Sequence, residues 1–199
     1  MSNFNVFFDY IEEISGKVLS DDDKLLLTEH FKPKKLRKRQ YFLQEGDVCK
    51  YIGFIVKGSA RTFTVDEKGH ENVLKLAVEK WWLADFESFY LLTPSRFNIE
   101  ALEDMEVLQS TNAQIEQYLK HIPAFSAMAN VINQNYTIAN QKRMQTAITY
   151  TAEERYEDLV NNYPHFLQRF PQNMIASYLG LSPETLSRLR KNSHTFGRK

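Results

Sequence analysis

Hydrophobic spacing divides the chain into a helical beginning, a β-rich middle and a helical end. Near the start, apolar residues recur at three- and four-residue intervals, the period of an amphipathic helix. These residues are Phe4, Phe7, Phe8, Ile11 and Ile14. Ser20 and the three aspartates after it are typical of an N-cap and an acidic first turn, so a second helix is expected over residues 24–31.

The middle of the chain, from Tyr41 to about Leu108, has short runs of β-branched and aromatic residues between turn signals. Four of the seven glycines fall here, where tight turns use positive φ. They are Gly46, Gly53, Gly58 and Gly69. Strands this short and closely spaced predict an antiparallel roll or barrel. Residues 81–90 interrupt the strands as an expected short helix, and strand character returns over residues 98–108.

After Thr111 the pattern is helical again. A short helix is predicted over residues 114–121 and a longer one up to about residue 145. The longer helix carries an apolar stripe of Phe125, Met128, Ile132, Tyr136 and Ala139. Two roles remain open for this stripe, packing on the roll or pairing with its copy in a second subunit. Thr151 and Glu154 have capping-box spacing and predict a further helix through residue 161.

Residues 172–191, QNMIASYLGLSPETLSRLRK, have the spacing of a helix-turn-helix. Two short helices that cross steeply need small or apolar residues at fixed places. Ala176 is the small residue in the first helix, Gly180 follows at the turn, and Leu186 lies in the second helix. The predicted buried set is completed by Ile175, Leu179, Leu181 and Leu189.

The second of these helices has a well-defined start, because Ser182 can cap it and Pro183 fits its first position. With its leucines turned inward, its polar side chains project from the opposite face. The candidate DNA-binding residues are Ser182, Glu184, Thr185, Ser187, Arg188, Arg190 and Lys191. Arg188 suits a bidentate contact to guanine and Glu184 a cytosine amino group. Phosphate contacts suit Ser187, Arg190, Lys191, Arg198 and Lys199. A plain helical hairpin with a solvated face is the alternative.

The distribution of charge supports a nucleic-acid partner although the net charge is zero. Residues 165–199 carry six basic side chains against Glu184 alone, a net charge of +5, so residues 1–164 carry −5. A basic end on an acidic body suits a DNA-binding module. A second basic run, residues 32–39, is expected to be a solvated lead-in to the strand at Tyr41, with a nucleic-acid contact as the alternative.

Other bulk properties indicate a cytoplasmic protein. The single cysteine, Cys49, excludes a disulfide within the chain and follows a turn, where a structural role is expected. No apolar run approaches the roughly 20 residues of a membrane span, and the first residues do not resemble a secretory leader. No membrane partner is expected.

Two segments of the sequence resemble the Crp/Fnr family of transcription regulators. ASYLGLSPETLSRLRK resembles the family's DNA-binding helices, and FLQEGDVCKYIGFIVKGSARTF is similar to the opening strands of its cyclic-nucleotide-binding-like roll. The resemblance implies an α+β fold with a jelly-roll-like antiparallel β-roll sensor domain over residues 1–121. A long dimerisation helix over residues 122–146 and a helix-turn-helix domain over residues 147–199 follow. It also implies a homodimer on a palindromic operator, with half-sites about one helical turn apart. RNA polymerase and a small-molecule effector are further candidate partners.

Two departures from the family pattern limit what the resemblance implies. Family members that bind cyclic AMP hold its phosphate with a Gly-Glu pair and an Arg followed by Ser or Thr. Here the matching stretch is ADFESFYLLTPSRFN, without the glycine, and Arg96 is displaced and followed by Phe97. The candidate effector-binding residues are Asp85, Glu87, Ser88 and Arg96. A buried phosphate would be poorly compensated, which disfavours cyclic nucleotide. Only eight residues follow Lys191, so the family's wing is expected to be short or missing.

Other kinds of site have little support in the sequence. A single cysteine disfavours an iron-sulfur cluster, the five histidines are scattered rather than paired as for haem, and no cofactor is predicted. A cupin-like metalloenzyme is disfavoured because His70 is the only histidine in the β region, so the chain is not expected to be an enzyme.

The principal rival is a degenerate, ligand-free roll on a protein that binds DNA constitutively or acts through protein contacts. Aromatic residues are then expected to fill the former ligand cavity or to line an apolar pocket. They are Trp81, Trp82, Phe86, Phe89 and Tyr90. If an effector does act, the hypothesis is a hinge between the long helix and the helix at residues 151–161. Signal-dependent DNA affinity would distinguish a sensor from a constitutive binder.

Overall fold

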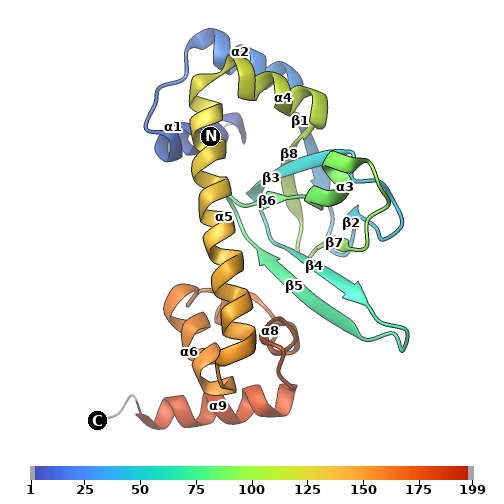
Figure 1. The fold of residues 1–199 in the computed structure, drawn as a ribbon, viewed down its shortest axis with the longest axis vertical. Coiled ribbons are helices and arrows are strands. Elements are labelled where there is room, and N and C mark those ends of the chain that lie inside the picture. Colours follow the sequence, from blue (N-terminus) through green and yellow to red (C-terminus); the bar gives the residue numbers. More distant parts are fainter. Residues whose placement is uncertain (1–2, 197–199) are drawn as a thin grey trace. The chain divides into compact units, whose positions relative to one another are not determined.

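The computed structural model describes residues 3–196 and has the predicted α+β architecture (Figure 1). The chain forms two compact units. The first comprises Met1–Thr64 and Leu74–Asn135, and the second comprises Val65–Val73 and Tyr136–Lys199. Each unit has its own buried side chains and is described separately below.

The first unit is built around a β-roll. Among the described residues, eight strands form two four-stranded sheets with the orders β1-β8-β3-β6 and β2-β7-β4-β5. The strands are β1 (Lys32–Leu36), β2 (Tyr41–Leu43), β3 (Tyr51–Lys57), β4 (Ala60–Val65), β5 (Glu71–Ala77), β6 (Trp82–Leu83), β7 (Asn98–Ala101) and β8 (Met105–Thr111). β8 pairs antiparallel with β1 on one side and with β3 on the other. The predicted antiparallel roll is therefore confirmed.

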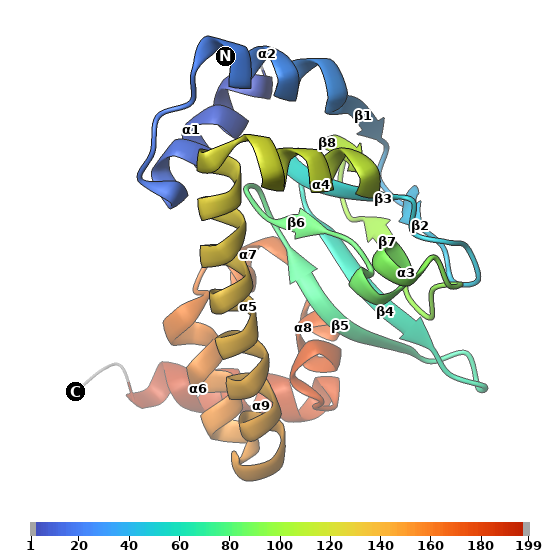
Figure 2. The same cartoon turned by 45° about the horizontal axis from the view of Figure 1, so that its top comes forward.

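The helices of the first unit are α1 (Asn3–Ser15), α2 (Asp21–His30), α3 (Phe86–Leu91) and α4 (Asn112–His121). Figure 2 shows α1, α2 and α4 gathered at one end of the roll. Their apolar faces close the core with an aromatic cluster. In that cluster the ring of Phe7 lies 4.6 Å from the ring of Phe31 and 5.0 Å from that of Phe54, and Trp82 meets Phe125 edge-on. Burial of such large apolar side chains is the main stabilising contribution to the unit.

Two element boundaries differ from the sequence prediction for local hydrogen-bonding reasons. α2 begins at Asp21 rather than at residue 24, because Ser20 and Asp23 form a reciprocal capping box with distances of 3.0 and 3.1 Å. The predicted helix over residues 81–90 is wrong in its first half, where Trp82–Leu83 is a strand paired with β3. α3 starts only at Phe86, because the Asp85 carboxylate caps it.

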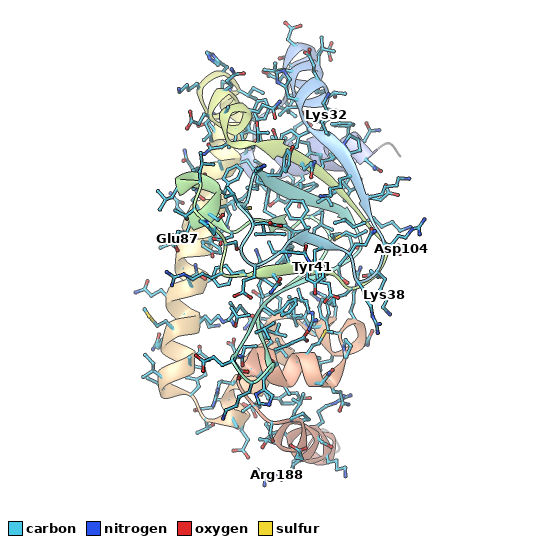
Figure 3. The ribbon with its side chains drawn as sticks, turned by 90° about the vertical axis from the view of Figure 1, so that its right-hand side faces the viewer. Lys32, Lys38, Tyr41, Glu87, Asp104 and Arg188 are labelled. Atoms are coloured by element: carbon cyan, nitrogen blue, oxygen red, sulfur yellow. The ribbon has the colours of Figure 1, made fainter. Side chains whose placement is uncertain are left out.

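The basic run at residues 32–39 is also corrected. Lys32–Leu36 was expected to be a solvated lead-in, but it is strand β1, with its backbone paired to β8 and Leu36 buried. At its end the backbone N–H of Lys38 donates to the Asp104 carboxylate at 3.0 Å, and both residues are labelled in Figure 3. The polar side chains of this strand give no β pattern in the sequence. Its strand character comes from pairing with β8, about 70 residues away in the chain.

The remaining helices are α5 (Pro123–Thr149), α6 (Ala152–Asn162), α7 (Phe166–Arg169), α8 (Gln172–Leu179) and α9 (Pro183–Phe196). The Thr151–Glu154 capping box before α6 is confirmed. α5 ends at Thr149, four residues beyond its predicted end near residue 145. The residues of the predicted apolar stripe differ in burial along this helix. Phe125 and Met128 are buried in the core of the first unit, whereas Tyr136 and the apolar residues beyond it are exposed.

Candidate DNA-binding motif and effector cavity

The contact between α8 and α9 is made by the small and apolar residues that the helix-turn-helix spacing predicts. Ala176 and Leu186 are fully buried, as is Ile175, and Leu189 is 5% exposed. Leu179 and Leu181 were predicted to be buried and are only half-buried, because they lie at the end of α8 and in the turn. The two helices therefore enclose an apolar contact that sets their crossing.

The turn between the two helices depends on Gly180. Its φ of 65° lies in the left-handed region, and the next N–H, that of Leu181, donates to the Ala176 carbonyl at 2.8 Å. A Cβ at this position would lie 3.3 Å from Nη1 of Arg155, which itself donates to the Leu179 carbonyl at 2.9 Å. α6 thus supplies a cation to the C-terminal end of α8, where carbonyl groups lack partners within the helix.

The predicted DNA-binding residues all lie at the start or along the length of α9. Ser182, Glu184, Arg188 and Lys191 are exposed, and the other three, Thr185, Ser187 and Arg190, are half-buried. Figure 3 labels Arg188 on this helix. Arg198 and Lys199, also predicted to contact phosphates, lie outside the described residues. The helix continues to Phe196, so within the described chain no strand follows it that would form a wing.

The start of α9 is fixed by the predicted cap. The Ser182 hydroxyl accepts a hydrogen bond from the Thr185 N–H at 3.2 Å. Hydrogen bonds from the Glu184 backbone N–H and the Ser182 hydroxyl lower the pKa of the Glu184 carboxyl. Glu184 is therefore held as an acceptor at the positive end of the helix.

Other residues that hold the motif have no local sequence signal, because their partners lie on distant elements. The Arg143 guanidinium on α5 lies 4.6 Å from the centre of the Tyr178 ring, and Lys142 pairs with Asp158 at 2.7 Å. The hydroxyl of Ser177 on α8 accepts from the Val73 N–H at 2.9 Å and donates to the Glu71 carbonyl at 3.2 Å. The second unit therefore holds α8 against α5 and against the residues that begin β5.

The four predicted effector residues lie around one cavity of about 260 Å³ in the first unit. It is lined by Asp85, Glu87, Ser88, Thr93, Pro94, Arg96 and Phe97. Asp85 and Ser88 are buried, whereas Arg96 and Glu87, which is labelled in Figure 3, are exposed. The structure therefore brings the four residues together, with Asp85 and Ser88 inside and Glu87 and Arg96 outside.

The buried polar groups of this cavity are already hydrogen-bonded to one another and to the backbone. The Asp85 carboxylate accepts from the Ser95 hydroxyl at 2.7 Å and from the Ser88 N–H at 3.3 Å. The Ser88 hydroxyl donates to the Thr93 carbonyl and accepts from the Cys49 N–H at 2.8 Å. A phosphate here would face a buried carboxylate and would find the donors of Ser88 and Ser95 already hydrogen-bonded.

The neighbouring aromatic residues divide between core and surface. Trp82 and Phe89 are buried, as core filling predicts. Tyr90 is 53% exposed and stacks on Phe86 with their ring centres 6.4 Å apart, so core filling is wrong for Tyr90. Cys49 is buried, and its thiol donates to the Tyr51 carbonyl at 3.3 Å.

The described residues hold no helix that is both long and apolar enough to cross a bilayer. The same part of the chain has no group of three or more His, Cys, Asp or Glu side chains arranged to hold a metal ion.

Comparison with known proteins gives the family of the roll and the fold of the chain. The family model "Cyclic nucleotide-binding domain" matches residues 33–121. No curated protein matches the sequence. The structure of a CooA variant from Carboxydothermus hydrogenoformans has a TM-score of 0.70 at 18% identity, over 94% of this chain and 84% of that one.

Two further structures show the same arrangement of elements. FixK2 from Bradyrhizobium japonicum has a TM-score of 0.67 at 18% identity, over 84% of this chain and 86% of that one. A proposed Crp/Fnr-family transcriptional regulator from Eubacterium rectale has a TM-score of 0.61 at 14% identity, over 90% and 85%. The chain therefore contains a cyclic nucleotide-binding domain at residues 33–121 and has the fold of these structures along most of its length.

Proposed function

We propose that this protein is a transcription regulator that binds specific DNA sequences through α9. The observation that carries the proposal is the division of α9 between a buried apolar side and an exposed polar side with Arg188 on it. An arginine that projects from a helix of this size suits a bidentate contact with guanine in the major groove. The regulator named among the similar structures supports the same function.

The protein acts as a homodimer in this proposal, joined through the exposed part of α5. Tyr136 and Met144 are 46% and 64% exposed, and Ile148 is 78% exposed. A row of apolar side chains left in water on one long helix is typical of a surface covered by a partner. A second copy of the chain would cover this surface. The two copies of α9 would then contact the two halves of a palindromic DNA site.

We further propose that the 260 Å³ cavity does not take cyclic nucleotide as an effector. The support is the internal bonding of Asp85 and Ser88 and the outward position of Arg96. A constitutive DNA binder and a regulator with a different effector are both compatible with this. DNA affinity measured with and without cyclic AMP tests the proposal, and equal affinities are expected because a ligand shifts only states that it binds unequally.

The test of DNA binding is selection from a random duplex library at moderate salt. We expect a palindrome with half-sites about 10 bp apart. Arg188→Ala is expected to weaken binding to it about tenfold or more, since a bidentate base contact contributes about 1–3 kcal/mol. Arg37→Ala is the matched control, because it removes the same charge from an exposed position on the roll.

Three outcomes separate the candidates. Loss of binding with Arg188→Ala alone supports the proposal. Loss with Arg37→Ala alone would place DNA on the basic run at residues 32–39 and overturn the role of α9. Recovery of no sequence, also in the presence of cell metabolites, would favour the rival in which the protein acts through protein contacts.

A further inference from the structure

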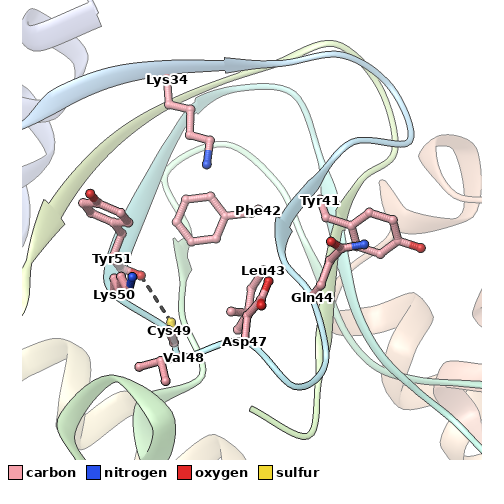
Figure 4. Close-up of a pocket in the computed structure, with 10 residues that line it drawn as sticks. All are labelled: Lys34, Tyr41, Phe42, Leu43, Gln44, Asp47, Val48, Cys49, Lys50 and Tyr51. Carbon is pink, nitrogen blue, oxygen red and sulfur yellow. Dashed lines mark hydrogen bonds between the residues drawn. The ribbon is translucent and has the colours of Figure 1, made fainter. Parts of the chain in front are cut away.

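The first unit has a second cavity, of about 340 Å³ (Figure 4). None of the four predicted effector residues lines it. It is bordered by β1, β2 and the loop that leads into β3. Its lining residues include Lys34, Phe42, Asp47 and Tyr51. An apolar cavity of roughly 150 Å³ is enough for benzene, so there is room here for a substituted aromatic ring.

The ring of Phe42 lines this cavity, and Gly53 on β3 leaves the room that the ring occupies. A Cβ at Gly53 would lie 2.9 Å from Cζ of Phe42, so any larger residue would push the ring away from the strand. A glycine inside a strand often marks such a close approach. Tyr51 supplies a second aromatic side chain and is 40% exposed. The cavity thus has aromatic surface in contact with solvent.

Lys34 gives the cavity a cation that is not paired with the Asp47 carboxylate, the acidic group of the same cavity. Its Nζ lies 5.2 Å from the centre of the Phe42 ring, and Figure 4 shows it directed at that ring. Burial lowers the pKa of Lys34, and no carboxylate of the described residues forms an ion pair with it. By contrast, the adjacent Lys35 pairs with Glu106 at 3.5 Å. An incompletely hydrated ammonium beside an aromatic face is suited to receive a carboxylate.

We propose that this cavity binds a small planar aromatic carboxylate. Its carboxylate would pair with Lys34, and its ring would lie on Phe42 beside Tyr51. Asp47, which Figure 4 shows on the other side of Phe42 from the Lys34 ammonium, would accept a hydrogen bond from a hydroxyl or amino group on the ring.

The loop that walls this cavity is hydrogen-bonded to the segment around the 260 Å³ cavity. The Asp47 carbonyl accepts from the Ser95 N–H at 2.8 Å, and the Gly46 N–H donates to the Ser95 carbonyl at 2.8 Å. The Cys49 N–H donates to the Ser88 hydroxyl. A ligand that contacts Asp47 therefore acts on a loop directly bonded to residues 88–95, the segment in which the resemblance places effector binding.

Isothermal titration with 4-hydroxybenzoate tests the proposal on the full-length protein. We expect saturable binding that Lys34→Met weakens about tenfold or more, because the variant removes the cation that would pair with the carboxylate. Lys38→Met is the matched control, since Lys38 lies on the same basic run but outside the cavity, and it should leave affinity unchanged. Benzamide, which lacks the charge, and cyclohexanecarboxylate, which lacks the aromatic face, should both bind more weakly.

A second variant protects the test against misfolding. Phe42→Leu keeps an apolar floor but removes the aromatic face, and should weaken 4-hydroxybenzoate while leaving cyclohexanecarboxylate unchanged. Thermal unfolding of each variant reports whether the roll is intact. Absence of saturable binding to the wild-type protein, or equal affinity of the wild type and a folded Lys34→Met variant, would overturn the proposal. Neither result bears on DNA binding by α9.

Discussion

The α8–α9 motif and the segment at residues 85–97 both carry polar residues that their sequence assigns to a partner, yet they use them differently. In α9 the apolar residues are buried and Arg188 stays exposed. Around α3 the polar side chains of Asp85 and Ser88 are themselves buried, and they form hydrogen bonds with other parts of the roll. Arg188 faces solvent, whereas Asp85 and Ser88 hold their own part of the chain in place.

The difference shows how hydrogen bonds within the protein limit what a polar group can offer to a ligand. A buried polar group has a limited hydrogen-bonding capacity, and it costs free energy to bury it unpaired. Once Asp85 caps α3 and receives the Ser95 hydroxyl, a ligand would have to break those bonds to use it. Substitutions should therefore affect folding at residues 85–97 and affect DNA binding on the outer side of α9.

The largest expected effect lies on the buried side of the helix-turn-helix. Leu186→Ala should lower the free energy of unfolding of the second unit by about 2–5 kcal/mol, because it leaves a cavity where a fully buried leucine stood. DNA binding should be lost with it. Urea unfolding followed by circular dichroism measures the change. Arg188→Ala is the control, with stability within about 0.5 kcal/mol of wild type. Equal destabilisation by both variants would remove the distinction between the two sides of α9.

A smaller effect is expected at the capped start of α3. Asp85→Ala should destabilise the first unit by about 1–3 kcal/mol, because the Ser95 hydroxyl and the Ser88 N–H lose their acceptor in a buried site. Glu87→Ala changes the same charge on the same helix at an exposed position and should be close to neutral. Thermal unfolding compares the two. If Asp85→Ala were neutral and the variant gained affinity for cyclic AMP, the carboxylate would be a gate for a ligand rather than a structural cap.

The same contrast explains what could be predicted from the sequence. The helix-turn-helix pattern could be predicted, because Ala176, Gly180 and Leu186 lie within about ten residues of one another. Contacts within that short segment explain why each position has its residue type. Strand β1 could not be predicted, because the lysines of Lys32–Leu36 give no β pattern. The strand is defined by its pairing with β8.

The predicted effector site shows the same limit. The four predicted effector residues do surround one cavity, but whether their polar groups are available depends on hydrogen bonds with Ser95 and Cys49, which the sequence did not single out as site residues. The cavity around Phe42 depends on Gly53, which looks in the sequence like one more turn glycine. Spacing identifies residues that act with their neighbours along the chain. Packing between distant elements decides what the others do.

The last effect is a dependence of stability on pH, which builds up gradually over several pH units, and it extends the contrast to a basic residue. Lys75 on β5 donates from Nζ to the Trp82 carbonyl at 2.9 Å, and burial lowers its pKa from 10.5 to about 8. Between pH 8 and 10.5 the unfolded chain therefore binds more protons than the folded one, so this residue makes stability rise with pH. The slope is at most about 1.4 kcal/mol per pH unit.

Lys75→Met isolates this contribution, because burial also raises the pKa of Cys49, whose titration lowers stability as pH rises. The stability of the variant relative to wild type should be greatest below pH 8 and should decrease as pH rises toward 10. Urea unfolding at four pH values between 7 and 10 measures the difference, with Lys38→Met, at an exposed position, as the control that should show no such trend. A difference independent of pH would mean that Lys75 stays charged on folding. In that case the roll would tolerate a buried cation as readily as α9 presents an exposed one.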